Sequence, residues 1–229
     1  EITFISPPSD TVSDGSIYLF NGEIRGDIEV YSEGALINHG TATFNGDVTL
    51  YCGTLINNGT VIFNGDVSCD DRGYSVIEQT LDSAKMYFRG NVTAYTYKEP
   101  GISAGTVILD GGEAQEVYLN KVYDIEVLNP NGINGEIHLY GNFDLHGNLY
   151  DGTVYMYDGA TFTEGSDYNQ VYIESEVTLR SNIKANVEVY DVYDGNLIIH
   201  SGKSYIIDGN LRVRSGLSIE KEAEFTVLG

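Results

Sequence analysis

The chain has 229 residues, of which 34 are acidic and 12 basic, so its formal net charge is −22. A surface of that sign repels phosphate backbones and anionic lipid headgroups, so we expect neither nucleic acid nor a membrane surface as a partner. Hydrophobic residues make up 41% of the chain and charged residues 20%, which indicates a folded protein; no apolar stretch approaches the roughly 20 residues of a membrane span.

A Gly-Asp or Gly-Asn dipeptide followed by alternating apolar residues recurs along the chain. Its glycines are Gly26, Gly46, Gly65, Gly90, Gly141, Gly195 and Gly209. The first two intervals are 20 and 19 residues, a period typical of a solenoid in which one small unit stacks on the next. The sequence therefore predicts an all-β fold: a single parallel β-solenoid of about ten rungs of roughly 20 residues, coiled right-handed. An antiparallel meander is the alternative, because the same dipeptides suit tight hairpins.

In chain order, we expect one domain over 1–229, with an N-terminal cap at 1–16, an insertion loop at 68–89, and a C-terminal cap or last strand at 217–229. Insertions in solenoids collect on one side and commonly carry binding. Alternation predicts short strands between these segments, each with two or three inward residues. The expected inward residues include Val48, Leu50, Cys52, Val61, Phe63, Cys69, Met86, Phe88, Leu211 and Val213.

The two cysteines, Cys52 and Cys69, share inward parity and lie 17 residues apart, close to one rung. Adjacent rungs are about 4.8 Å apart, so a small shift in register would bring the two sulfurs within bonding range. An inter-rung disulfide and a pair of reduced buried thiols both remain open. Neither thiol is expected to be catalytic, because no histidine in the same rung is placed to activate it.

Acidic residues at the corners of the coil are candidates for a metal site. Asp27, Asp47 and Asp66 are expected to stack in one column, where they either point into water or share a hard cation such as calcium. Asp70 and Asp71 in the expected insertion form a second candidate. Asp and Asn are also good turn formers after glycine. We therefore expect no cofactor, with calcium as the alternative.

Tyrosine is unusually frequent, at 18 residues, and many tyrosines have outward parity. Exposed rings on a flat wall can stack on the apolar faces of sugar rings. The alternatives are a tyrosine ladder that stacks on itself across rungs, and a protein interface. The candidate ligand-binding residues are Tyr95, Tyr97, Tyr155 and Tyr157, which form two pairs spaced two apart, together with Tyr118 and Tyr140.

Catalysis is not expected from this sequence. Acidic pairs are so abundant that no choice of an acid and a base would be supported. The Asn-Thr-Asp, Gly-His-Gly and Arg-Ile-Lys triplets of pectin-degrading β-helix enzymes do not occur in the chain. A polysaccharide lyase or hydrolase is kept as an alternative.

The segment GTVILDGGEAQEVYL, from Gly105 to Leu119, is similar to a segment common in secreted bacterial parallel β-helix adhesins. The chain also resembles the tāpirins, which pair a β-helix with exposed aromatic residues for cellulose attachment. Its run from Ser16 to Phe63 resembles the bactofilins, polymer-forming solenoids of the bacterial cytoskeleton.

The adhesin resemblance implies a secreted or cell-surface bacterial protein that attaches without catalysis to a plant or cell-surface polysaccharide such as cellulose. A structural or protein-binding adhesin module is the alternative. Because the sequence begins at Glu1 without Met or a signal peptide, we expect a segment of a longer secreted protein.

Overall fold

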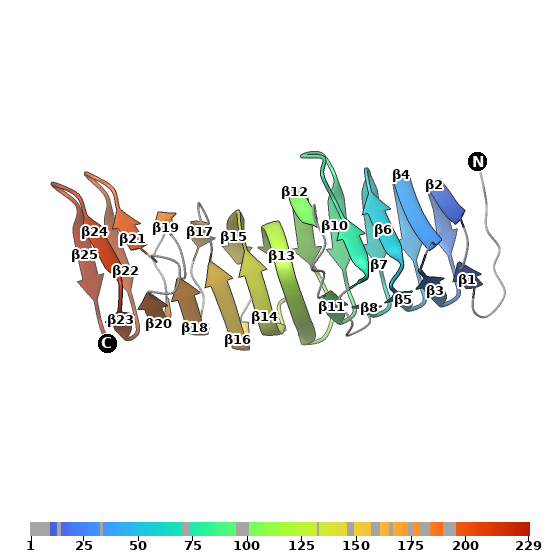
Figure 1. Cartoon of the computed structure of the whole chain (residues 1–229). Helices are drawn as coiled ribbons and strands as arrows, with labels where there is room; N and C mark the ends of the chain where they lie inside the picture. The colour runs from blue at the N-terminus through green and yellow to red at the C-terminus, as the bar shows by residue number, and fades with distance from the viewer. Residues whose placement is uncertain are drawn as a thin grey trace.

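The computed structural model describes residues 10–12, 15–32, 34–69, 74–94, 101–131, 133–145, 149–156, 161–164, 167–173, 176–178, 184–189 and 196–229. Within these residues the chain forms strands and no helix, and the strands follow one another along a rod from β1 at one end to β25 at the other (Figure 1). Each pairing between named strands in this part of the chain is parallel. The predicted parallel β-solenoid is thereby confirmed, and the antiparallel meander is wrong.

The strand bounds are as follows. The first half of the coil contains β1 (Asp10–Val12), β2 (Gly15–Ile24), β3 (Ile28–Tyr31), β4 (Gly34–Phe44), β5 (Val48–Tyr51), β6 (Thr54–Asn57), β7 (Thr60–Phe63), β8 (Val67–Cys69), β9 (Val76–Glu78), β10 (Lys85–Phe88), β11 (Val92–Ala94), β12 (Ile102–Leu109) and β13 (Gln115–Val127). The second half contains β14 (Ile133–Leu139), β15 (Asn142–Leu145), β16 (Leu149–Met156), β17 (Thr161–Glu164), β18 (Asp167–Ile173), β19 (Glu176–Thr178), β20 (Lys184–Val189), β21 (Asn196–Ile199), β22 (Ser204–Ile207), β23 (Leu211–Val213), β24 (Gly216–Ile219) and β25 (Glu224–Val227).

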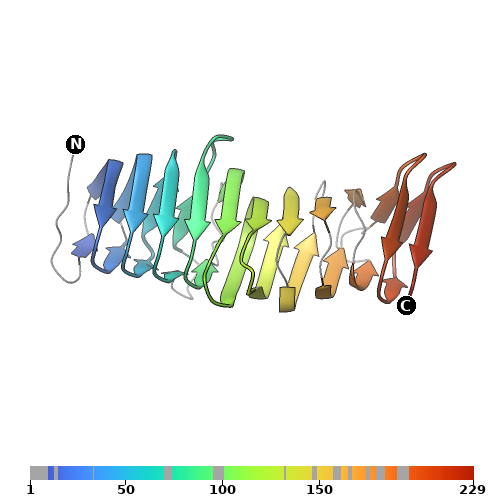
Figure 2. The same cartoon turned by 180° about the vertical axis from the view of Figure 1, so that it is seen from behind.

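One rung, meaning one turn of the coil, consists of three short strands. β5, β6 and β7 follow one another, and β8 then pairs with β5 in register, so that Val67 lies beside Val48. Side chains alternate between the two faces of a strand, so every second residue of each strand points into the coil. The rung therefore has three walls around an apolar interior, and Figure 2 shows the stacked walls from behind.

Strands of successive rungs stay paired while the lengths of the rungs vary. From Val48 to Val67 the interval is 19 residues, from Val67 to Val92 it is 25, and from Val171 to Val187 it is 16. In the described part of the chain one wall contains eleven successively paired strands, so the number of levels differs slightly from the expected ten: β1, β3, β5, β8, β11, β13, β14, β16, β18, β20 and β23. The difference in length lies in the turns, because hydrogen bonds between rungs hold only the strands in place.

The range 68–89, expected as an insertion loop, instead carries strands of the coil. β9 pairs with β6 and β10 pairs with β7, so Met86 lies beside Val61. At the ends, β1 pairs with β3, β2 pairs with β4, and β24 and β25 belong to the last rung. Alternation of apolar residues continues through these ranges, which is why the chain keeps coiling there.

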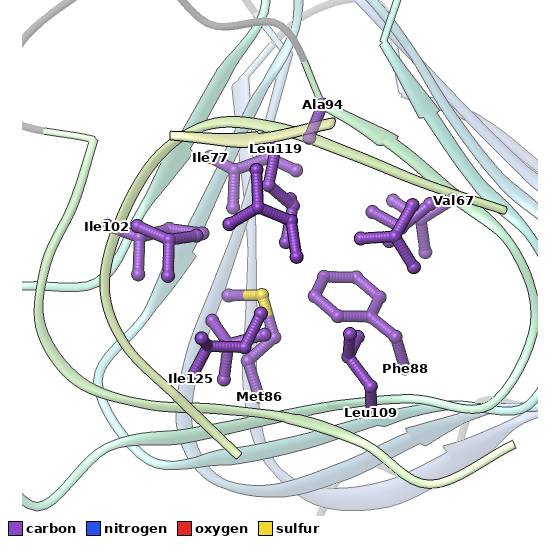
Figure 3. Close-up of a cluster of buried hydrophobic side chains, with 14 of the residues drawn as sticks. Val67, Ile77, Met86, Phe88, Ala94, Ile102, Leu109, Leu119 and Ile125 are labelled. Atoms are coloured by element: carbon purple, nitrogen blue, oxygen red, sulfur yellow. The ribbon is translucent and has the colours of Figure 1, made fainter. Parts of the chain in front are cut away.

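The core is a column of buried side chains inside the coil. Figure 3 shows Met86, Phe88, Leu109 and Ile125 pointing toward one another within the enclosing ribbon. Phe44, Phe63 and Phe88 occupy the same position in successive rungs, and their rings stack with centroids 5.1 and 5.3 Å apart. Burial of each such side chain contributes about 1.5–3 kcal/mol, so the repeating core stabilises each rung against the next.

Two residues expected to point inward do not occupy the core. Cys52 is half-buried and has a left-handed backbone conformation, with φ of 60°, so the alternation of β5 ends there. Val213 is 38% exposed because β23 belongs to the last rung. Cys69 pairs with Leu50 in the register of β5 and β8, so it does not lie beside Cys52. Cys52 and Cys69 form no disulfide.

Candidate functional site

The acidic corner residues form the predicted column, and hydrogen bonds between rungs hold it together. Asp27 Oδ1 accepts from the backbone N–H of Asp47 at 2.9 Å. Asp47 Oδ1 accepts from the N–H of Asp66, and Asp66 Oδ1 from the N–H of Asn91, both at 2.8 Å. Asn91 Oδ1 continues the pattern to the N–H of Glu116 at 2.8 Å. We call Asp27, Asp47, Asp66 and Asn91 the Asx column.

Gly46, Gly65 and Gly90, which precede Asp47, Asp66 and Asn91, are required by the same packing. A Cβ atom on Gly65 would lie 2.5 Å from Asp47 Oδ1 and 2.6 Å from the carbonyl oxygen of Gly46. Such contacts are too short for any other residue without a shift of the backbone. The Gly-Asp repeat thus has two causes. The Asp side chain bonds to the backbone of the next rung, and the Gly leaves space for the Asp side chain of the preceding rung.

In each of the three aspartates of the Asx column, Oδ1 therefore accepts a hydrogen bond from a backbone N–H of the next rung. In the residues that the structure describes, no group of three or more His, Cys, Asp or Glu side chains could hold a metal ion. Asp70 and Asp71, the second metal candidate, lie outside the described residues.

A second polar ladder lies inside the coil, and the sequence analysis did not predict it. Asn38 Nδ2 donates to Asn57 Oδ1 at 2.8 Å, and Asn57 Nδ2 donates to Gln79 Oε1 at 2.7 Å. All three side chains are fully buried. The available signal was the repeat Ile-Asn-X-Gly-Thr, which occurs at residues 37–41 and again at 56–60.

This interior ladder also fixes backbone groups of the corner. Asn57 Oδ1 accepts from the N–H of Gly59, and Asn57 Nδ2 donates to the carbonyl of Lys85 at 2.9 Å. Amide side chains carry no charge and do not titrate. The ladder therefore holds rungs in register and provides no acid or base for catalysis.

Tyr31 and Tyr51 form an exposed stacked pair on the wall of β3 and β5. Their ring centroids are 5.0 Å apart at an interplanar angle of 24°, and each residue is 38% exposed. Partial desolvation, followed by the hydrogen bond to Glu29, raises the pKa of Tyr31 above its ordinary value. Each ring covers one face of its neighbour, so these two tyrosines stack on each other across one rung.

Further along the same wall, β14 and β16 bring a second group of aromatic residues together. The register pairs His138 with Tyr155, and their rings stack with centroids 4.5 Å apart at 25°. His138 Nε2 lies 2.9 Å from Glu136 Oε1. Tyr140 follows two residues after His138 and is 37% exposed.

Tyr123 joins this group from the preceding rung. Val122 pairs with Leu139, and the N–H of Tyr140 donates to the carbonyl of Val122 at 2.8 Å, so Tyr123 and Tyr140 occupy equivalent positions. Tyr123 is 44% exposed. We call Tyr123, His138, Tyr140 and Tyr155 the aromatic patch. Tyr123 was missed from the sequence because the chain bends within β13, where the register shifts between Leu119 and Val122.

The other predicted tyrosines are placed as follows. Tyr118 lies on β13, half-buried, and pairs with Glu136 of β14, so it is on the wall of His138 but two residues earlier along the strand. Tyr95, Tyr97 and Tyr157 lie outside the described residues. Of the six candidates, the structure therefore brings Tyr140 and Tyr155 into the aromatic patch and Tyr118 close to it in register.

A polar hollow of about 250 Å³ opens beside the Asx column, lined among others by Asp66, Arg89, Asn91 and Glu113. The guanidinium group of Arg89 bonds Asp110 at 3.3 Å and Asn64 at 3.1 Å. Arg89 therefore links neighbouring rungs at the rim of this hollow.

Comparison with known protein families, with curated proteins and with solved structures gave no match. Among the described residues there is no helix with the length and hydropathy needed to cross a bilayer.

Proposed function

We propose that the chain is a non-catalytic carbohydrate-binding module that attaches to an extracellular polysaccharide of the cellulose type through the aromatic patch. The observation that supports the proposal is the placement of aromatic side chains at matching positions of neighbouring rungs: His138 stacks on Tyr155, and Tyr123 and Tyr140 occupy equivalent positions just after the bend that follows this wall. Aromatic rings with a polar tip suit sugars, because the ring packs on C–H faces and the hydroxyl meets sugar hydroxyls.

The scaffold favours a long ligand over a small one. Rungs repeat about every 4.8 Å along the rod, so a linear polymer lying along the axis meets one rung after another. The patch residues are fixed by strand pairing, which lowers the entropy cost of ordering them on binding. Glu136, beside His138, adds a carboxylate that accepts hydrogen bonds from sugar hydroxyls.

The net charge of −22 favours a neutral polysaccharide over an acidic one. Fixed negative charge repels uronate or sulfate groups over a Debye length of about 8 Å at physiological salt. The proposal therefore specifies neutral glucans or similar plant and cell-surface polymers, and a secreted or cell-surface location in a bacterium.

The test is retention on insoluble cellulose and plant cell wall by the variant Tyr123→Ala/Tyr140→Ala. Two aromatic contacts of about 0.7 kcal/mol each would lower the affinity about tenfold. Binding isotherms from depletion of the protein from solution give that ratio.

A matched control is Tyr31→Ala/Tyr51→Ala, which removes two tyrosines of similar exposure from β3 and β5. Their faces are already stacked on each other, so retention should change less than twofold. Equal loss in both variants, or no retention of the parent chain on any neutral polysaccharide, would contradict the proposal.

A structural or protein-binding module is the second candidate, and the stacked pair Tyr31 and Tyr51 favours it. If the exposed tyrosines serve the rod itself, removing them lowers stability and leaves glycan retention unchanged. Thermal unfolding of the two double variants, measured beside the isotherms, separates the two candidates.

A further inference from the structure

The polar hollow beside the Asx column has a floor that the chain itself holds in place. Gln115, which lines the hollow, is 2% exposed. Its Nε2 donates to the carbonyl groups of Phe88 and Gly90 at 3.0 and 2.7 Å. Its Oε1 accepts from the N–H of Gly111 at 3.0 Å and from Asn129 Nδ2 at 2.8 Å. These contacts fix the loop between β12 and β13, so a ligand in the hollow meets a surface that is already ordered.

The lining of the hollow offers both donors and acceptors of hydrogen bonds. Arg89 uses two of the five N–H groups of its guanidinium on Asp110 and Asn64 of the described residues, so three are left for a ligand. No described residue donates a hydrogen bond to the carboxylate of Glu113, which lines the same hollow. A hydroxyl group both donates and accepts. The mixed lining therefore suits a ligand that carries several hydroxyl groups.

Size and charge narrow the choice of ligand further. The hollow of about 250 Å³ is smaller than the roughly 300–1,000 Å³ of pockets for drug-sized ligands, so it takes one sugar unit and not a length of chain. The charge of Arg89 is balanced by Asp110 at 3.3 Å, whereas the carboxylates of Asp66 and Glu113 have no cationic partner among the described residues. Fixed negative charge repels uronate and sulfate groups. A neutral sugar unit is therefore favoured.

The register places the hollow to one side of the aromatic patch. Asn91 bonds to the N–H of Glu116, and Glu116 pairs with Asn134, which precedes His138 by four residues on β14. The hollow is therefore about 13 Å from His138 along the strand direction, and about 10 Å, or two rungs, from it along the rod. A polymer that follows the rod over His138 and Tyr155 passes beside the hollow, so a side branch can reach it and the main chain cannot.

We propose that the hollow binds the terminal sugar of a neutral side branch, so that the preferred ligand is a branched glucan whose main chain lies on the aromatic patch. This inference rests on the proposed function for the main chain and adds a second, separate contact. N–H groups of Arg89 donate to hydroxyls of the branch sugar, and the carboxylate of Glu113 accepts from them. An unbranched chain contacts the patch alone, so the hollow gives selectivity for branched polymers.

Isothermal titration calorimetry with two soluble oligosaccharides of equal main-chain length tests the proposal. Cellotetraose is unbranched, whereas the xyloglucan nonasaccharide has the same main chain of glucose with galactosyl-xylosyl branches. Hydrogen bonds to charged groups strengthen the contact of the branched ligand, so we expect it to bind about tenfold more tightly. Hydrogen exchange at residues 112–114 should slow with the branched ligand and stay unchanged with cellotetraose.

Two variants change the hollow without touching the patch. Glu113→Ala removes the carboxylate acceptor, and Ala114→Phe fills the hollow; both residues are exposed. Each variant should lower the affinity for the nonasaccharide about fivefold or more and leave that for cellotetraose unchanged. Asp82→Ala is the matched control, because it removes one exposed carboxylate from the turn between β9 and β10, and it should change neither affinity. Circular dichroism shows whether the variants fold.

The outcomes separate the branch contact from the proposed function. Equal affinity of the parent chain for the two oligosaccharides, or an equal loss for both in Glu113→Ala, would overturn the branch contact alone. Binding of the nonasaccharide but not of cellotetraose, lost in Glu113→Ala, would support the hollow and count against the aromatic patch. Binding of neither would overturn the branch contact, and retention on insoluble cellulose would then decide the proposed function by itself.

Discussion

The carboxylate of Asp47 accepts a hydrogen bond at 2.8 Å from the backbone N–H of Asp66, one rung further along the coil. Asp47 donates its own N–H to Asp27 in the same way. Each corner is therefore joined to its neighbours by a side chain as well as by the strand ladders. The same arrangement places three like charges, those of Asp27, Asp47 and Asp66, about one rung spacing apart, where they repel one another.

Replacing Asp47 separates these two effects. Asp47→Asn keeps the acceptor oxygen and removes one charge from the column, so we expect equal or higher stability. Asp47→Ala loses the acceptor for the N–H of Asp66 and should lower the free energy of unfolding by about 0.5–1.5 kcal/mol. Urea denaturation at low salt gives both values, and Asp82→Ala, at an exposed position outside the column, is the control. An Ala variant as stable as Asn would show that the column contributes nothing.

Replacing Gly65 tests whether the Gly-Asp repeat needs glycine for steric reasons. In Gly65→Ala the new methyl group lies 2.5 Å from Asp47 Oδ1 and 2.6 Å from a backbone oxygen, so the corner must shift. We expect a loss of about 1–3 kcal/mol, measured by chemical denaturation. Gly112→Ala is the control, because a methyl group there meets nothing within 4 Å. Similar stability of both variants would mean that the corner yields freely.

Gly46, Asp47, Gly65 and Asp66 show why the fold could be predicted from the sequence. Each corner satisfies its requirements locally, so the same dipeptide returns with every rung and the period can be counted. The interior ladder of Asn38 and Asn57 left an equally periodic signal. Its meaning was hidden because Asn before Gly is also an ordinary turn sequence.

The aromatic patch could be predicted only in part. Parity correctly placed Tyr155 on the outside of β16, but parity does not give the orientation of a ring. Stacking of Tyr155 on His138 depends on the register between β14 and β16, which the turns of unequal length set. Tyr123 follows a shift in register within β13, and a shift of one position reverses the face on which a side chain lies.

Asn57 provides a test of the interior ladder with a defined pH dependence. Asn57→Asp puts a carboxylate at a fully buried site beside Gln79 Oε1 and the carbonyl of Lys85, both of which are acceptors. Its pKa in the folded state should rise above the ordinary value of about 3.9. We expect a loss of about 3–5 kcal/mol at pH 7.

The sign of the pH effect follows from that raised pKa. The protonated carboxyl can donate a hydrogen bond as the amide did. The loss of stability is therefore absent at pH values below the pKa of the unfolded state, and it is complete once the pH has risen above the pKa of the folded state. Denaturation at pH 4 and pH 7 measures the difference. Asn58→Asp adds the same charge at the adjacent turn and should show little of this dependence; equal behaviour of the two variants would contradict the buried ladder.

Glu220 ties the last rung to the one before it, with the opposite pH dependence. Its carboxylate accepts from the N–H of Ser201 at 2.7 Å and lies 3.0 Å from His200 Nδ1. These two hydrogen bonds, the backbone one first, lower the pKa of Glu220 below its ordinary value of 4.5. A lowered carboxyl pKa adds stability at pH values above 4.5 that is lost as the pH falls through the folded value. We expect Glu220→Gln to reduce the change in melting temperature between pH 6 and pH 3, whereas Asp208→Asn should leave that change as it is.

Hydrogen exchange gives a second measurement of the same contact. Because β24 ends at Ile219, Glu220→Gln should also speed hydrogen exchange in β24 at pH 6. Unchanged exchange and an unchanged pH profile would show that this carboxylate does not hold the last rung.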